Sequence, residues 1–350
     1  MNTPWSVRVS AALVVAGLTA CADTTAPLPP PAEVLVVVNS TEASLTVVPV
    51  ESPGNATTIP LGGTTPTPVS VATREGIAIV PMGLDNTAVV VDLKAGHVVK
   101  TIFLPPGSGA TGVAIVNDSI AYVGNPNLNS VTRINFLRGD TATVAVGVYP
   151  EAIVFTRGKL FVLNGNLENF SPVGESWITV IDPVTNSKAT GVDSIPLPGP
   201  GNAGFADVAS DGLLYIVSSG DFFTGEGRLS IVDPVGRQEV ANFSGFGTGP
   251  GALAADGGER LFITSFSEGL MEFNTRTRVV VLGAGAGIDI PGNSAIEVDS
   301  KGRIYAITTG PCSGGVPGVA HVLKANLAET GTIDLGECSI FATVTTIPPQ

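Results

Sequence analysis

Short apolar segments of one shape recur seven times along this chain of 350 residues. Each has five residues, mostly aliphatic or aromatic, and most end in a small polar residue. We call them the marker strands: LVVVN (35–39), IAIVP (77–81), AYVGN (121–125), LFVLN (160–164), LYIVS (214–218), LFITS (261–265) and IYAIT (304–308). Their second residues lie 42, 44, 39, 54, 47 and 43 positions apart. A period of that size, built only from strands, predicts a β-propeller with one blade per copy.

Each marker strand has a strand-like segment before it and two after it. The first segment after the marker ends in Asp or Asn in six of the seven copies: Asp92, Asn135, Asp182, Asp233, Asn274 and Asn326. Asp and Asn side chains accept hydrogen bonds from backbone N–H groups a few residues ahead, which closes a turn. We therefore predict that these six residues form turns and have no catalytic role.

The two ends of the repeat complement each other. The first unit begins directly with its marker strand at Glu33 and lacks the strand that should precede it. Beyond the last unit, residues 339–347 (SIFATVTTI) have the alternating pattern of that missing strand. We therefore predict an all-β fold, a seven-bladed β-propeller over residues 33–350, closed by pairing of the N- and C-terminal strands in one blade.

The first 32 residues do not fit the repeat. Residues 9–20 are apolar or small, but a run of 12 is too short to cross a bilayer and fits a secretory signal peptide. Leu18-Thr19-Ala20-Cys21 resembles a bacterial lipoprotein signal-peptidase site, which implies that residues 1–20 are removed and that Cys21 is lipidated. The alternative is an ordinary signal peptide with an incidental Cys21.

Residues 21–32 are rich in proline and predict an extended tether between the lipidated cysteine and the propeller. The lipid on Cys21 would then attach the protein to the membrane. Ala22 stands where an inner-membrane retention signal would have Asp, so we expect the outer membrane, on its periplasmic or surface face, rather than the inner one.

Net charge narrows the range of partners. Removal of residues 1–20 takes away Arg8 and leaves 16 basic and 30 acidic side chains, a net charge of −14. Phosphate backbones would repel such a chain, so we expect no nucleic-acid partner. We also expect a monomer.

LFVLN followed by WITVIDPVTN, and LYIVS followed by LSIVDP, resemble the YVTN family of β-propellers, with departures at Pro49 and Pro81. The resemblance implies a secreted propeller from a group that also contains lactonases and quinoprotein dehydrogenases. Lactonase-type propellers hold a metal in the central channel with Glu, Asp and Asn from several blades. The positions that correspond here are Asn39, Asn125, Glu151, Asn164 and Asn293. Ca²⁺ or another divalent ion would suit such oxygen ligands, although turn formation explains the Asn residues equally well.

Cys312 and Cys338 fall in loops that a four-stranded blade brings to one face. An exported protein meets an oxidising environment, so we predict a disulfide between them, against the alternative of two independent buried thiols.

Three loops on that same face are longer than the rest. From marker end to turn residue the spacing is 18, 15 and 18 residues in blades four, five and seven, and 9 to 11 elsewhere. Large aromatic side chains in polar loops often form contact anchors, although they can also fold back into local cores. The binding candidates in blades four and five are Asn166, Glu168, Phe170, Asp221, Phe222 and Phe223.

No nucleophile motif appears, and His97 and His321 fall on different blades, so we single out no catalytic residue. The leading hypothesis is a non-catalytic envelope lipoprotein that binds a protein, glycan or small ligand through loops on one face. A metal-dependent lactonase-type hydrolase with its site in the channel is the first alternative. The second is a structural subunit of an envelope complex.

Overall fold

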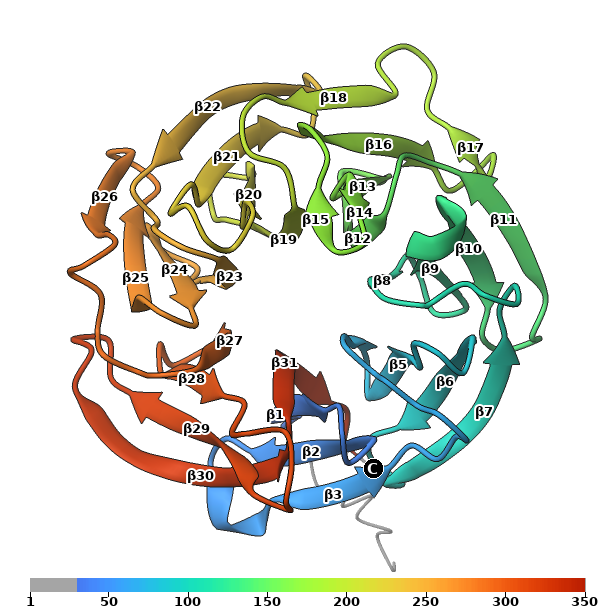
Figure 1. Cartoon of the computed structure of the whole chain (residues 1–350). Coiled ribbons are helices and arrows are strands. Elements are labelled where there is room, and N and C mark those ends of the chain that lie inside the picture. The colour runs from blue at the N-terminus through green and yellow to red at the C-terminus, as the bar shows by residue number, and fades with distance from the viewer. Residues whose placement is uncertain (1–29, 350) are drawn as a thin grey trace, which may run out of the picture.

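The computed structural model describes residues 30–349, which form seven antiparallel sheets arranged around a ring (Figure 1). The predicted all-β, seven-bladed propeller is confirmed. The predicted signal peptide, Cys21 and residues 21–29 of the predicted tether lie outside the described residues.

Blades one to three each have four strands, which are ordered from the innermost outward as follows. Blade one contains β31 (Ser339–Ile347), β1 (Ala32–Asn39), β2 (Ser44–Pro49) and β3 (Thr57–Pro60). Blade two contains β4 (Ala72–Arg74), β5 (Ile77–Pro81), β6 (Thr87–Asp92) and β7 (His97–Phe103). Blade three contains β8 (Val113–Ile115), β9 (Ile120–Asn125), β10 (Ser130–Asn135) and β11 (Thr141–Ala145). Two short 3₁₀ turns, η1 (Pro53–Asn55) and η2 (Pro126–Leu128), lie between strands.

Blade four departs from this plan in two places. After β12 (Pro150–Thr156), β13 (Lys159–Asn164) and β16 (Ser176–Asp182), its outer strand is split into β17 (Ser187–Lys188) and β18 (Ser194–Leu197), which both pair with β16. Its long loop adds a small hairpin of β14 (Leu167–Glu168) and β15 (Ser171–Pro172).

Blades five to seven return to four strands. Blade five contains β19 (Ala203–Val208), β20 (Leu214–Ser218), β21 (Arg228–Asp233) and β22 (Gln238–Ser244). Blade six contains β23 (Pro250–Ala255), β24 (Arg260–Ser265), β25 (Gly269–Asn274) and β26 (Val279–Leu282). Blade seven contains β27 (Asn293–Val298), β28 (Ile304–Thr308), β29 (Pro317–Leu323) and β30 (Glu329–Glu337).

The marker strands are the second strands of the blades, and both of their faces are buried. On β1, Val36 packs with Val80 of blade two, while Val37 on the other face packs with Tyr305 of blade seven. A strand that is buried on both faces needs apolar side chains at successive positions rather than at alternate ones. This explains why the marker strands are almost continuously hydrophobic.

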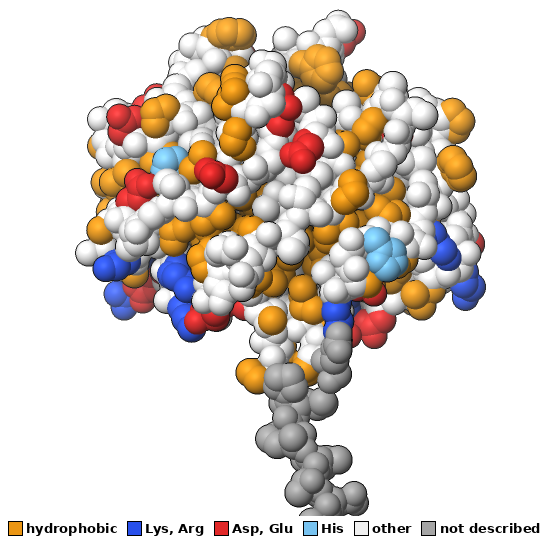
Figure 2. Space-filling view, turned by 90° about the horizontal axis from the view of Figure 1, so that it is seen from below, with side chains coloured by type: hydrophobic (Ala, Val, Ile, Leu, Met, Phe, Trp, Pro, Cys, Tyr) orange, Lys and Arg blue, Asp and Glu red, His pale blue; other side chains and the backbone are white. Residues whose placement is uncertain are grey.

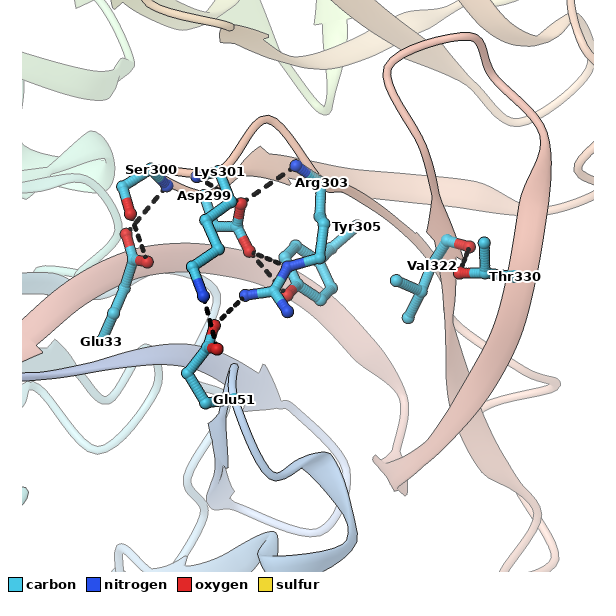
Figure 3. A network of polar contacts seen from close by, with 9 residues as sticks. All are labelled: Glu33, Glu51, Asp299, Ser300, Lys301, Arg303, Tyr305, Val322 and Thr330. Carbon is cyan, nitrogen blue, oxygen red and sulfur yellow. Dashed lines mark hydrogen bonds and ion pairs between the residues drawn. The ribbon is translucent and has the colours of Figure 1, made fainter.

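The ring closes through β31, as predicted. This strand pairs with β1 from Ala32 opposite Ile347 to Asn39 opposite Ser339, so blade one contains both ends of the repeat. Polar contacts join the same blade to blade seven (Figure 3). The Glu33 carboxylate accepts hydrogen bonds from Ser300, and Glu51 pairs with Lys301 and Arg303.

The predicted turn role of the Asp and Asn residues after the third strands is confirmed. Asp92 Oδ1 accepts hydrogen bonds from the backbone N–H groups of Lys94 and Ala95 at 2.9 and 2.8 Å. The other five residues each accept a backbone N–H from two or three positions ahead: Asn135, Asp182, Asp233, Asn274 and Asn326.

The predicted disulfide is present. Cys312 in the loop between β28 and β29 is bonded to Cys338, which lies between β30 and β31. The bond therefore fastens blade seven at the point where the chain enters the closing strand. No helix in residues 30–349 has the length and apolar character that a membrane crossing requires.

We expect the double variant Cys312→Ser/Cys338→Ser to unfold with a free energy lower by roughly 3 kcal/mol. The two cysteines are 26 positions apart, and the open loop would regain the chain entropy that the bond removes from the unfolded state. Urea unfolding of the oxidised protein and the variant measures this difference. A reducing agent should lower the stability of the parent by the same amount and leave the variant unchanged. Equal stability of the parent and the variant would contradict the prediction.

Candidate functional site

Every blade presents the end of its second strand and the start of its innermost strand on one face of the ring. In blade five, for example, Ala203 at the start of β19 lies opposite Ser218 at the end of β20. We call this side the loop face, because the long loops 165–175, 219–227 and 309–316 lie on it. Strand β1 begins on the opposite side at Ala32, so we call that side the N-terminal face.

The two faces differ in charge. The three long loops contain four acidic side chains and no Lys or Arg: Glu168, Glu175, Asp221 and Glu226. Most basic residues lie in turns of the N-terminal face, among them Lys94, Arg138, Arg157, Arg237, Arg276 and Lys301. Figure 2 shows the Lys and Arg side chains of this view toward one edge of the molecule, with some Asp and Glu beside them, whereas the opposite part shows Asp and Glu without Lys or Arg.

The blade-four loop is shaped by Asn166. Its Nδ2 donates to the Glu175 carbonyl at 2.9 Å, and its own carbonyl accepts from Val173 N at 3.0 Å. These bonds close the loop around the β14–β15 hairpin, where Glu168 is exposed. Phe170 lies at the hairpin tip, 74 % exposed, with its ring edge-to-face against Tyr149 at a centroid distance of 6.1 Å.

The blade-five loop is shaped by Asp221 in the same way. Its Oδ1 accepts hydrogen bonds from Phe223 N and Thr224 N at 2.8 and 2.9 Å, and these bonds lower the pKa of the carboxyl. The turn leaves Phe222 49 % and Phe223 87 % exposed. Asn166 and Asp221 therefore hold the loops in shape, and the phenylalanines project from them.

One aromatic side chain of this face was missed by the sequence reasoning. Phe266 lies in the short turn between β24 and β25 of blade six and is 67 % exposed. Loop length could not reveal it, because the blade-six loop is the shortest of the seven. A search for every aromatic residue just after a marker strand would have found it. Exposed phenylalanines thus occur on three consecutive blades.

The innermost strands enclose a central cavity of about 400 Å³, lined by residues from all seven blades. Of the five channel candidates, only Glu151 lines it. Two further carboxyl side chains, Asp207 of β19 and Glu297 of β27, also line it. The sequence signal for these two is an acidic residue inside an otherwise apolar inner strand, in FADV and AIEV.

The four asparagine candidates are buried within the blades. Asn39 Nδ2 donates to Ser44 Oγ and Thr46 Oγ1 of the next strand at 2.9 and 2.8 Å, and its Oδ1 accepts from Ser339 Oγ at 2.8 Å. Asn125 and Asn164 donate to threonine hydroxyls of their third strands at 2.9 and 3.0 Å. Asn293 is buried at the start of β27. The amides of Asn39, Asn125 and Asn164 therefore link neighbouring strands, which differs from both the turn formation and the metal binding considered from the sequence.

Glu151 lies where the channel opens on the loop face, beside Tyr149. Its carboxyl is held against two glycines: a Cβ atom on Gly204 would lie 2.3 Å from Oε2, and one on Gly165 would lie 2.8 Å from Oε1. Any other residue at position 204 would displace this carboxyl. Burial raises the pKa of Glu151 to about 8, and no hydrogen bond or ion pair within residues 30–349 opposes that rise.

Asp207 and Glu297 lie at the other end of the channel, at equivalent positions of blades five and seven. In the strand register, Asp207 lies opposite Tyr215 of β20 and Glu297 lies opposite Tyr305 of β28, and these two tyrosines also occupy equivalent positions. Asp207 Oδ2 accepts a hydrogen bond from Ala255 N of blade six at 2.9 Å. Burial raises the pKa of both carboxyls, and the charge of Asp207 raises the pKa of Glu297 further. Across residues 30–349, no three His, Cys, Asp or Glu side chains are close enough together to hold a metal ion.

Comparison with known proteins supports the fold. The structure is similar to that of a chain of hydrazine synthase from Kuenenia stuttgartiensis, with a TM-score of 0.62 and 14 % sequence identity over 82 % of this chain and 97 % of that one. At this identity the likeness shows a shared β-propeller architecture. No protein-family model and no curated protein sequence matches the chain.

We expect the stability of the protein to fall between pH 5 and pH 8, and to fall less in Glu151→Gln. The folded state keeps the Glu151 proton until the pH passes about 8, whereas the unfolded state loses it near 4.5, so the contribution of Glu151 to stability is greatest below 4.5 and is lost as the pH rises through 8. Chemical unfolding at both pH values should give a difference between the parent and the variant of at least about 1 kcal/mol.

Tyr149 beside Glu151, and Asp207 and Glu297 at the far end of the channel, are titratable groups of the same channel region, and they remain in both proteins. Their contributions therefore cancel in the comparison. Parallel pH profiles for the parent and the variant would show that Glu151 ionises normally.

Proposed function

We propose that this protein is an exported, lipid-anchored β-propeller of the YVTN repeat type that binds a partner through its loop face. The β-propeller fold is typical of binding and scaffold modules, and the Cys312–Cys338 disulfide fits an oxidising compartment. The described chain enters the fold on the N-terminal face. An anchor at Cys21 would therefore hold that face toward the membrane and leave the loop face free for a partner.

The observation that carries the proposal is the state of the loop phenylalanines. Phe170 and Phe222 both have left-handed backbone angles, with φ of +62° and +65°. This conformation is unfavourable for a bulky residue, by about 1–2 kcal/mol. A strained backbone that exposes an aromatic ring does not serve stability, so we attribute it to contact with a partner.

The chemistry of the loops indicates what the partner offers. Phe170, Phe222, Phe223 and Phe266 provide apolar contact area at low conformational cost. The acidic side chains around them, with no Lys or Arg in the three long loops, favour a partner surface with positive charge. An aromatic and acidic surface of this kind suits a basic, partly apolar segment of a protein better than an anionic glycan.

We expect Phe222→Gly and Phe223→Ala each to weaken partner binding by at least tenfold without loss of stability. Phe222→Gly relieves the left-handed strain, so the free energy of unfolding should stay constant or rise by up to about 1 kcal/mol. A photo-crosslinking amino acid at position 223 identifies the partner in cells, and titration of that partner measures the affinity.

Phe103→Ala is the matched control, because Phe103 is 80 % exposed on the outer strand β7 of blade two, outside blades four to six, which carry the loop phenylalanines. It should leave binding unchanged. If the loop variants bind normally but unfold more easily, the phenylalanines serve local packing and the proposal fails.

We expect Cys21→Ser to move the protein from the membrane fraction to the soluble fraction of a bacterial host. Globomycin, which blocks the lipoprotein signal peptidase, should cause the unprocessed parent chain to accumulate. Cys312→Ser/Cys338→Ser keeps Cys21 and should remain in the membrane fraction. Retention of the Cys21→Ser variant in the membrane, with processing insensitive to globomycin, would rule out the anchor.

A further inference from the structure

We propose that the central channel binds a linear organic diamine as a dication, with one ammonium group on Glu151 and the other on Asp207 and Glu297. This inference does not depend on partner binding at the loop face. It rests on the shape of the cavity, the nature of its walls and the placement of its carboxyl groups.

The cavity is large enough for a small ligand and is mostly apolar. Its volume of about 400 Å³ is in the range of small-molecule sites. The walls include apolar residues from several blades, among them Val69, Val113, Ile153, Leu253, Ile296 and Phe341. Such walls would bury a chain of methylene groups, at roughly 0.8 kcal/mol for each group.

The carboxyl groups lie at two levels along the channel. Glu151 is level with Gly204, against which its carboxyl rests, and Gly204 precedes Asp207 by three residues on β19. At about 3.3 Å per residue, the two levels are roughly 10 Å apart. With ammonium–carboxylate distances of about 2.8 Å, the two nitrogens would be about 4 Å apart if they lay in line between the carboxyls and about 10 Å apart if they lay beside them. A diamine with about four to six methylene groups, whose nitrogens are roughly 6 to 9 Å apart, falls within this range.

The charge of the channel points to a cationic ligand. The residues that line the cavity include Glu151, Asp207 and Glu297 and, within the described chain, no Lys, Arg or His. An ammonium group would supply the missing countercharge at each level. A single metal ion would not, because it cannot reach carboxyl groups at both levels, and a monoamine would leave one level without a partner.

Diamine binding at this site should be coupled to the protonation of its carboxyl groups. Without a ligand, burial favours the neutral form of all three carboxyls. An ammonium group favours the ionised form, so binding at pH 7 should release protons and should tighten as the pH rises from 6 to 8. Tyr149, the titratable neighbour of Glu151, has a pKa raised by burial and by the charge of Glu151, and it stays neutral throughout this range.

Isothermal titration of the purified full-length protein with 1,5-diaminopentane tests the inference. We expect saturable binding at 1:1, with proton release seen as different apparent enthalpies in Tris and phosphate buffers. Pentylamine and 1,5-pentanediol, which have the same chain with one or no ammonium group, should bind at least tenfold more weakly. CaCl₂ at millimolar concentration should not displace the diamine.

Variants that replace the carboxyl groups at either level test the site, and one further variant serves as the control. Glu151→Gln and Asp207→Asn/Glu297→Gln should each weaken diamine binding at least tenfold, whereas Asp118→Asn, in an exposed turn of the N-terminal face, should not change it. If the double variant does not fold, Glu151→Gln alone decides the question. Absence of binding at millimolar diamine, equal binding of pentylamine, displacement by Ca²⁺, or unchanged binding by Glu151→Gln would each overturn the inference.

Discussion

The constraint on which this structure depends is the burial of both faces of every blade. Side chains on successive positions of a second strand pack against different neighbouring blades, as Val36 and Val37 of β1 do against blades two and seven. No blade can satisfy this requirement alone, because each needs a neighbour on both sides. The ring must therefore close, and the closing strand β31 supplies the last neighbour as well as the missing strand of blade one.

Closure concentrates specific interactions at one place. The β1–β31 pairing, the Cys312–Cys338 bond and the contacts of Glu33 and Glu51 with blade seven all lie at the junction of blades seven and one. The buried amide of Asn39 joins them, since it bonds to Ser44 and Thr46 on one side and to Ser339 on the other. These contacts fix the register in which the two chain ends meet.

A scaffold that is closed and buried leaves two places for variation: the loops on one face and the inner edges of the innermost strands. On the loops, Asn166 and Asp221 satisfy the backbone and hold exposed phenylalanines in place. On the inner edges, Glu151, Asp207 and Glu297 bring acidic groups into an apolar cavity. Both places combine aromatic or apolar surface with acidic groups, which is why we propose a cationic partner for each.

The repeat, the blade count, the closure and the turn role of Asp92 and its counterparts could all be predicted from the residues in order. They depend on local chemistry and on a period that every blade repeats. The loop phenylalanines of blades four and five could be predicted as candidates from loop length, but that criterion passes over Phe266, because its loop is the shortest of the seven. Among the channel carboxyls, Glu151 was a candidate from the sequence, whereas Asp207 and Glu297 were missed for a different reason. Asp207 and Glu297 are 90 positions apart, and only the curvature of the closed ring brings their strands around one cavity, while Asn39, Asn125 and Asn164, which end their strands in the same pattern, turn into the blades instead.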